Sequence, residues 1–179
     1  MITAYQQLAL SGRTPTAKET AKQSGYALRS LYERFGTVEI LCMAAFEQAT
    51  KPGWVFGAEE ASLSERSTRI EHHVRARANF CAKWHKLWQV ANAVATDTSY
   101  TALTNSLANM RKDYAAWLRL IYRPDLESAS SAGRQQCLAM LIALTSFESW
   151  NLLRGDFGLA VEEIKDGWRS TIAGVLPPP

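Results

Sequence analysis

A short basic segment near the N-terminus carries residue types that contact nucleic acid. Arg29, Ser30 and Tyr32 fall within about two turns of one predicted helix. The arginine fork matches the paired acceptors of guanine in the major groove, and hydroxyl groups hydrogen-bond to phosphate oxygens. The segment 13–34 holds five basic and two acidic residues, so it accounts for the whole formal net charge of +3. Attraction to a polyanion is therefore expected at this segment.

The sequence around this segment predicts two short helices joined by a glycine turn. Thr16 and Glu19 have the spacing of a capping box, which begins a helix. Gly25 permits the left-handed backbone that ends a helix, and a second helix of about residues 27–35 follows directly. A short basic helix after a tight turn is typical of the helix-turn-helix, which presents its second helix to the major groove.

The remainder of the chain has helical spacing, and strand-like alternation is absent, so we expect an all-α fold. The breaker sequence at residues 51–53 predicts a boundary between a first domain, 1–50, and a second domain, 51–179. The other expected helices cover about residues 2–10, 37–50, 64–95, 99–122, 132–154 and 159–175, with a break at residues 123–125.

The segment 16–41 resembles the DNA-binding domain of the tetracycline-repressor (TetR) family of bacterial transcription regulators. The resemblance rests on eight positions at the family's spacing: Thr16, Ala21, Gly25, Leu31, Tyr32, Phe35, Glu39 and Leu41. It implies an N-terminal three-helix helix-turn-helix DNA-binding domain and a C-terminal helical bundle for ligand binding and dimerisation. Such a protein is a non-enzymatic repressor without a cofactor, which binds a palindromic double-stranded DNA operator as a homodimer and leaves it on binding a small-molecule inducer.

Helix geometry and the resemblance together give the candidate DNA contacts. Leu31 and Tyr32 lie about 100° apart around the helix, so Leu31 can pack inward while Tyr32 faces phosphate. Arg29 and Ser30 are the candidates for base contacts, and Thr16 at a helix N-terminus can bind phosphate. For any of these side chains the alternative is a solvated surface position. The full set is Thr16, Lys22, Leu28, Arg29, Ser30, Tyr32 and Arg34.

Three positions depart from the family pattern. Ala27 stands where Ser or Thr usually caps the second helix, so a phosphate contact and about 1 kcal/mol of capping are missing. Val38 replaces a frequent phosphate-binding lysine, and Thr20 replaces a customary buried isoleucine. Because each lost phosphate contact removes part of the salt-dependent affinity, we expect weak non-specific DNA binding.

Aromatic residues at helical spacing in the second domain could line an apolar cavity for a small apolar or aromatic molecule. Ordinary core packing is the alternative, since aromatic residues recur at this spacing in many cores. The candidate ligand-binding residues are Phe80, Trp84, Trp88, Tyr114, Trp117, Phe147 and Trp150.

The last two predicted helices share an apolar face interrupted by one carboxylate. The resemblance implies that these helices meet their copies across a two-fold axis. Burial inside one chain is the alternative. The candidate dimer residues are Leu141, Leu144, Glu148, Ile164, Trp168 and Ile172.

Other patterns favour a cytoplasmic protein without a metal site. The chain has no apolar run long enough for a membrane and no secretory leader pattern, and its three cysteines are far apart. Cys81 and His85 lie one helical turn apart, so a metal-sensing regulator is one alternative. Another is a small all-α enzyme or ligand carrier with a coincidental helix-turn-helix, although we find no catalytic arrangement.

Overall fold

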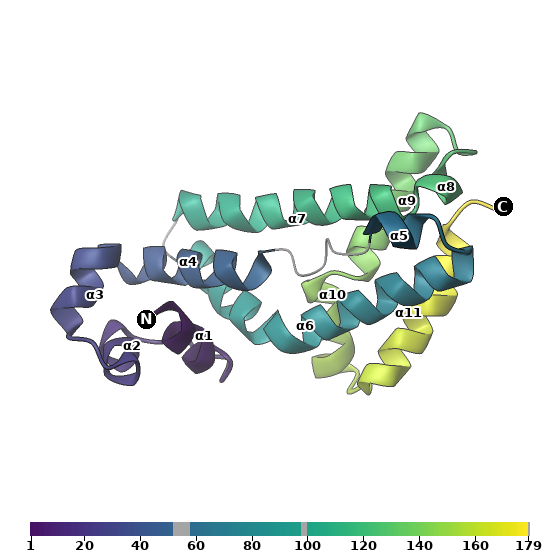
Figure 1. Ribbon diagram of the computed structural model, residues 1–179. Coiled ribbons are helices and arrows are strands. Elements are labelled where there is room, and N and C mark those ends of the chain that lie inside the picture. The colour runs from purple at the N-terminus through teal and green to yellow at the C-terminus, as the bar shows by residue number, and fades with distance from the viewer. Residues whose placement is uncertain (52–57, 98–99, 179) are drawn as a thin grey trace. The chain divides into compact units, whose positions relative to one another are not determined.

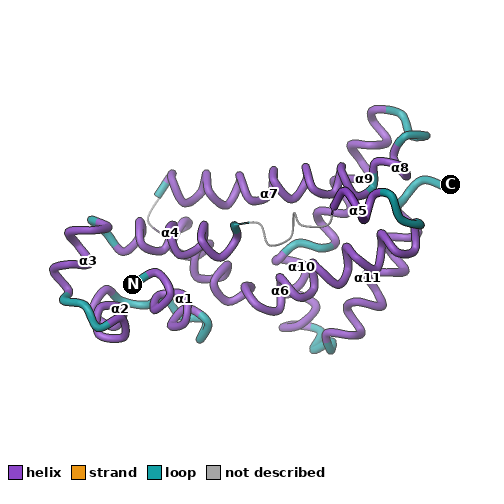
Figure 2. The backbone as a smooth tube through the Cα atoms, in the orientation of Figure 1, coloured by secondary structure: helices purple, strands orange, loops and turns teal. Residues whose placement is uncertain are grey.

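The computed structural model describes residues 1–51, 58–97 and 100–178, and it is 81% helical. Within these ranges no strand is present, so the all-α expectation is confirmed. Figures 1 and 2 show helices along nearly the whole chain. None of the helices in the described ranges has the length and apolar character needed to cross a membrane.

Twelve helical elements make up the described chain. The first seven are α1 (Ile2–Ala9), α2 (Ala17–Ser24), α3 (Leu28–Phe35), α4 (Val38–Thr50), α5 (Ala58–Ser62), α6 (Arg66–Asp97) and α7 (Thr101–Ile121). The others are α8 (Arg123–Leu126), α9 (Ser131–Leu144), α10 (Phe147–Asn151), the π-helical turn η1 (Leu152–Asp156) and α11 (Val161–Val175). The first four match their expected ranges within two residues.

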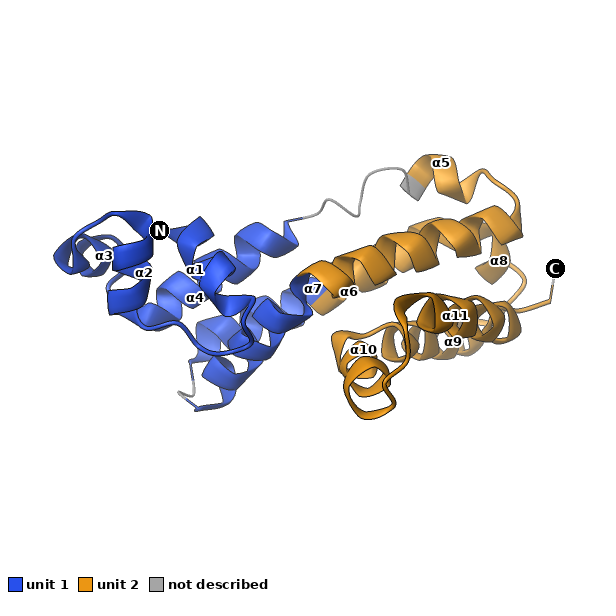
Figure 3. Ribbon diagram, turned by 90° about the horizontal axis from the view of Figure 1, so that it is seen from below, with its two compact units in different colours: residues 1–51, 84–110 blue, residues 52–83, 111–179 orange. Residues whose placement is uncertain are grey.

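The chain divides into two compact units, shown in different colours in Figure 3. Unit 1 comprises Met1–Lys51 and Trp84–Met110, and unit 2 comprises Pro52–Lys83 and Arg111–Pro179. Helices α6 and α7 therefore contribute residues to both units. Residues 84–97 and 100–110, which the sequence-based division assigns to the second domain, belong to unit 1 together with the N-terminal helices.

Unit 1 is built on contacts among α1, α2, α3 and α4. Its core contains the fully buried side chains of Tyr5, Leu31, Leu41 and Phe46. Each of these side chains lies on the side of its helix that packs into unit 1. Since isolated helices this short are marginal in water, their mutual packing is what stabilises α1 to α3.

Unit 2 contains the packed pair α9 and α11, together with the first part of α6 and the last part of α7. Phe147, Trp150, Trp168 and Ile172 are among its fully buried side chains. Arg169 of α11 forms an ion pair with Glu71 of α6 at 2.6 Å, which joins these two helices at the surface.

One sequence-based helix prediction for unit 2 was wrong, and one was incomplete. The expected helix 132–154 is three elements, because Thr145 ends α9 and the Ser146 side chain accepts a hydrogen bond from the backbone N–H of Ser149 to begin α10. The helix expected at residues 99–122 does end there, since α7 ends at Ile121, but residues 123–125 begin the short helix α8. Pro124 lies in its first turn, where a missing backbone N–H costs nothing.

Candidate functional site

The first turn of α2 is held by a capping box and a bidentate ion pair. The Glu19 N–H donates to Thr16 Oγ1 at 3.2 Å, and the Thr16 N–H donates to Glu19 Oε2 at 2.9 Å. Arg13 donates to both Glu19 carboxylate oxygens, at 3.1 and 2.8 Å. These hydrogen bonds, led by those from Arg13, lower the pKa of Glu19 to about 2. The capping box predicted from the sequence is therefore confirmed, and Thr16 stands exposed at a helix N-terminus.

Gly25 forms the turn between α2 and α3. Its φ of 73° lies in the left-handed region, and the Tyr26 N–H donates to the Ala21 carbonyl at 3.1 Å across the turn. A Cβ atom at Gly25 would have nothing within 4 Å, so a larger residue would be strained by backbone conformation alone. The glycine lets α3 start after only three intervening residues.

Helix α3 turns one apolar side chain inward and its basic and hydroxyl groups outward. Leu31 is fully buried, whereas the next residue, Tyr32, is 47% exposed. Arg29 has a side chain that is 89% exposed. The other candidate DNA contacts follow the same pattern, with Ser30 half-buried and Thr16, Lys22, Leu28 and Arg34 exposed. Six of the seven candidate residues are thus exposed and one is half-buried, and all lie on α2, on α3 or at the N-terminus of α2.

Arg29 is engaged by Glu33 one turn later on α3. Its Nε donates to Glu33 Oε1 at 2.7 Å, and both side chains are exposed. An exposed pair of this spacing stabilises a helix by only about 0.3–0.5 kcal/mol. The ion pair therefore leaves Arg29 free to exchange Glu33 for another acceptor.

The three departures noted in the sequence have visible structural counterparts. Ala27 is the N-cap residue of α3 and makes no side-chain capping bond. Thr20 is fully buried, and its hydroxyl donates to the Thr16 carbonyl at 3.0 Å, which satisfies the polar group in the core. Val38 begins α4 and is half-buried.

The predicted ligand-binding residues are divided between the two units. Phe80, Tyr114, Trp117, Phe147 and Trp150 belong to unit 2. There the Phe80 and Phe147 ring centroids lie 5.5 Å apart, and those of Tyr114 and Trp117 lie 5.9 Å apart. Trp84 and Trp88 belong to unit 1. In unit 2 the gap lined by Ala76, Arg77, Phe80, Tyr114 and Trp117 leaves no room for a water molecule.

Arg77 lies among three of the unit 2 rings and was not among the site residues predicted from the sequence. Its guanidinium carbon lies 4.3 Å from the Tyr114 ring centroid, 4.9 Å from that of Phe147 and 5.4 Å from that of Phe80. Arg77 Nε donates to the carbonyl of Thr145, the C-cap residue of α9, at 2.6 Å. Arg77 follows Val74 by three residues on the buried side of α6. The sequence signal that could have pointed to it is an arginine at a position where the helical spacing predicts an apolar residue.

A chain of buried hydrogen bonds runs beside Arg77. The single hydroxyl proton of Thr145 is donated to the Leu141 carbonyl at 2.6 Å, so its oxygen accepts from the Tyr114 hydroxyl at 2.5 Å. The Tyr114 oxygen then accepts from His73 Nε2 at 2.7 Å, and His73 Nδ1 accepts from the Tyr122 hydroxyl at 2.8 Å. This order requires a neutral His73. Burial, together with the charge of Arg77, lowers the pKa of His73 to about 3.

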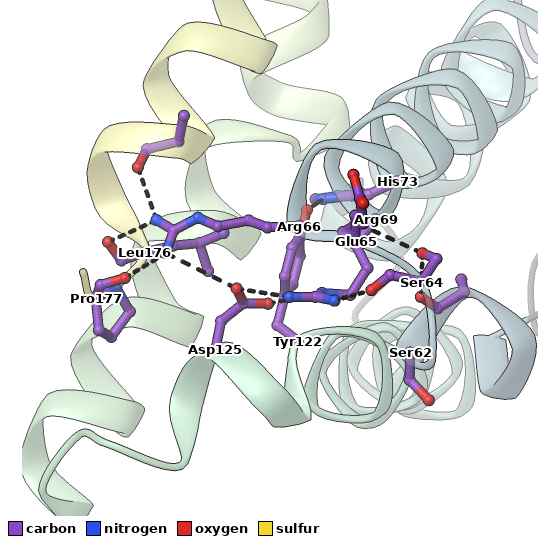
Figure 4. Close-up of polar contacts among 12 residues, drawn as sticks. Ser62, Ser64, Glu65, Arg66, Arg69, His73, Tyr122, Asp125, Leu176 and Pro177 are labelled. Carbon is purple, nitrogen blue, oxygen red and sulfur yellow. Dashed lines mark hydrogen bonds and ion pairs between the residues drawn. The ribbon is translucent and has the colours of Figure 1, made fainter. Parts of the chain in front are cut away.

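A second buried polar cluster in unit 2 contains a complete ion pair (Figure 4). Arg69 Nε and Nη2 both donate to the Asp125 carboxylate at 2.9 Å, and Arg69 also donates to the Ser64 carbonyl. Arg66 Nη1 lies 3.8 Å from Asp125, and its guanidinium donates to carbonyls at the end of α11 and beyond, including that of Leu176 at 3.2 Å. The cluster joins α6, α8 and α11, and its arginines have their acceptors.

The dimer prediction was wrong for four of its six residues. Leu141, Ile164, Trp168 and Ile172 are at most 1% exposed in the single chain, because α9 and α11 pack against each other and against other parts of unit 2. They form intrachain core, which was the alternative considered. Leu144 is half-buried, and Glu148 is exposed and paired with Arg111 at 2.8 Å.

Among residues 1–51, 58–97 and 100–178, no three His, Cys, Asp or Glu side chains are grouped so that they could hold a metal ion. Cys42, Cys81 and Cys137 are all buried free thiols. Comparison with known proteins found no matching family model, no matching curated protein and no matching solved structure.

Proposed function

We propose that this protein is a ligand-responsive DNA-binding transcriptional regulator that represses from a palindromic operator as a homodimer. The observation that carries the proposal is the orientation of α3. Leu31 anchors the helix in unit 1, while Arg29, Tyr32 and Arg34 remain exposed on a helix that follows α2 through the Gly25 turn. In this proposal α2 and α3 are the two helices of a helix-turn-helix, and α3 enters the major groove.

The side chains divide into two roles in this proposal. Arg29 and Ser30 hydrogen-bond to base edges, and Leu28 makes apolar contact with a thymine methyl group. The remaining candidates, Thr16, Lys22, Tyr32 and Arg34, bind phosphate and set the orientation of the helix. Because phosphate binding releases counterions, the affinity should fall as salt concentration rises.

The dimer in this proposal uses surfaces other than the core between α9 and α11. Two recognition helices must lie about 34–36 Å apart to enter successive major grooves. A ligand that favours a different separation weakens DNA binding by its difference in affinity for the two conformations. The two copies therefore have to associate through side chains that remain exposed on each chain.

The proposal is tested by selecting bound duplexes from a random-sequence DNA library and measuring their affinity by gel shift. We expect a discrete complex on a palindromic site. Arg29→Ala should weaken the complex by about 10- to 100-fold, as expected for a lost bidentate base contact. Tyr32→Phe should weaken it severalfold and leave the base preference unchanged.

Arg119→Ala is the matched control, because Arg119 is an exposed arginine in unit 2, far from α3 along the chain. It removes the same charge and should leave the affinity unchanged. Circular dichroism of each variant checks the helical content. Failure to enrich any sequence with the folded protein, or equal losses in Arg29→Ala and Arg119→Ala, would refute the proposal.

A further inference from the structure

Arg77 is a buried cation with an incomplete set of partners. It is 5% exposed, and only its Nε has a hydrogen-bond acceptor, the Thr145 carbonyl. Among the residues that the structure describes, no carboxylate lies within ion-pair distance of it. A buried charge is costly unless it is paired, so the position of Arg77 requires an explanation.

Arg69 provides a comparison within the same helix and unit. It is 7% exposed, and two of its nitrogens donate to the Asp125 carboxylate at 2.9 Å. Arg77 is buried to the same degree, but its Nη1 and Nη2 have no acceptor in the described chain. These two nitrogens are also absent from the fully enclosed polar atoms, so each keeps a small exposure to solvent.

Within the described part of the chain, the groups facing Arg77 supply no negative charge. The neighbouring His73 is fully buried, and burial lowers its pKa to about 3, so it is neutral. Burial raises the pKa of the Cys81 thiol to about 11 and also raises that of the Tyr114 hydroxyl, so both remain protonated. The rings of Phe80, Tyr114 and Phe147 offer cation–π contact to the guanidinium but leave its net charge uncompensated.

We propose that unit 2 binds a small aromatic carboxylate, whose two oxygens accept hydrogen bonds from Nη1 and Nη2 of Arg77. A guanidinium presents its donors in a planar fork that matches a carboxylate. The ring of the ligand packs against Phe80, Tyr114 and Trp117, which line the same gap. Because the gap is closed to water, the half-buried Phe80 ring moves aside on binding. The inference that this ligand is the inducer rests on the proposed function, whereas binding itself does not.

The test is isothermal titration of the full chain, without DNA, with two matched pairs of probes. Benzoate and indole-3-acetate carry the carboxylate, and benzamide and indole-3-acetamide are their neutral counterparts. We expect at least one carboxylate to bind with Kd below about 1 mM, and its amide to bind at least tenfold more weakly. Arg77→Gln should weaken carboxylate binding by about 10- to 100-fold, the usual effect of losing hydrogen bonds to a charged group.

Arg77→Lys keeps the charge and removes the fork, so it should bind more tightly than Arg77→Gln and more weakly than the unchanged chain. Arg119→Gln removes an exposed arginine of the same unit and should leave binding unchanged. If Arg77→Gln fails to fold, the acid-to-amide contrast on the unchanged chain decides the question. Absence of binding by both carboxylates, equal binding by the amides, or a loss in Arg119→Gln equal to that in Arg77→Gln would overturn the proposal.

Release of DNA is measured separately, by adding the carboxylate that binds to a preformed protein–DNA complex. Carboxylate binding by a chain that selects no DNA supports the anion site and refutes the proposed regulator. DNA selection by a chain that binds neither carboxylate supports the proposed regulator and refutes the anion site. The two proposals therefore fail independently.

Discussion

Acidification should destabilise this protein through the buried residue His73. In the folded chain its two ring nitrogens are used by the hydroxyls of Tyr122 and Tyr114, at 2.8 and 2.7 Å, and burial lowers the pKa of His73 to about 3. In the unfolded chain the pKa of a histidine is about 6.5. Between these values the unfolded state binds a proton that the folded state does not, so stability falls as the pH decreases from about 6.5 to 3.

The magnitude follows from proton linkage. A full proton of difference changes the free energy of unfolding by about 1.4 kcal/mol per pH unit. Between pH 8 and pH 5 the unfolded histidine becomes almost fully protonated, which costs about 2 kcal/mol. The complete loss below pH 3 is about 5 kcal/mol, a large part of the stability of a small domain.

The assay is urea unfolding followed by tryptophan fluorescence at pH 8, 7, 6 and 5, for the unchanged chain and for His73→Gln. Glutamine retains one acceptor and one donor for the two tyrosines but does not titrate. Between pH 8 and 5 the unchanged chain should lose about 2 kcal/mol more than the variant. His72 and His85 are present in both proteins and cancel in this comparison. The reasoning would be refuted if stability depended equally on pH in the two proteins, or if the unchanged chain were more stable at pH 5 than at pH 8.

Three further predictions concern ion pairs and thiols. Asp125→Asn leaves the buried Arg69 without its carboxylate and should lower the free energy of unfolding by about 3–5 kcal/mol. Glu162→Gln breaks the ion pair between Lys165 and Glu162, whose side chain is 72% exposed, and should cost less than about 1 kcal/mol. Urea unfolding compares the two variants, and equal losses contradict the argument. Glu33→Gln releases Arg29 from its ion pair and should strengthen DNA binding about two- to fivefold at low salt. Gel shifts at two salt concentrations measure this effect. No gain in affinity would mean that Glu33 does not compete with phosphate for Arg29. The thiols of Cys42, Cys81 and Cys137 are buried, and burial raises the pKa of each. A thiol reagent at pH 8 should therefore label none of them in the folded chain and all three after unfolding. Rapid labelling of the folded chain would contradict this.

The N-terminal helices were largely predictable because their determinants are local. The capping box joins Thr16 to Glu19, three residues later, and the turn depends on the backbone freedom of Gly25. Leu31 and Tyr32 are neighbours whose opposite orientations follow from helix geometry once one side packs inward. Interactions over three or four residues are specified by the sequence wherever the helix forms.

The interior of unit 2 was less predictable, even though its helices were expected. The helix face containing Leu141 and Trp168 was recognised as apolar, but a pattern of apolar residues does not say whether the same chain or a second copy covers it. The break after Leu144 was also missed, because Thr145 and Ser146 act as caps only where the chain turns.

The sequence by itself determined the helical class, the start and end of the first four helices, and the outward orientation of Arg29 and Tyr32 on α3. Only the tertiary structure decided that Arg77 lies among aromatic rings with no described carboxylate in ion-pair range, while Arg69 pairs with Asp125, 56 residues away. The physical reason is that the cost of burying a charged or polar group depends on the partners that other helices bring to it. Those partners are separated along the chain by many turns of helix and share no pattern of spacing with the group that they satisfy.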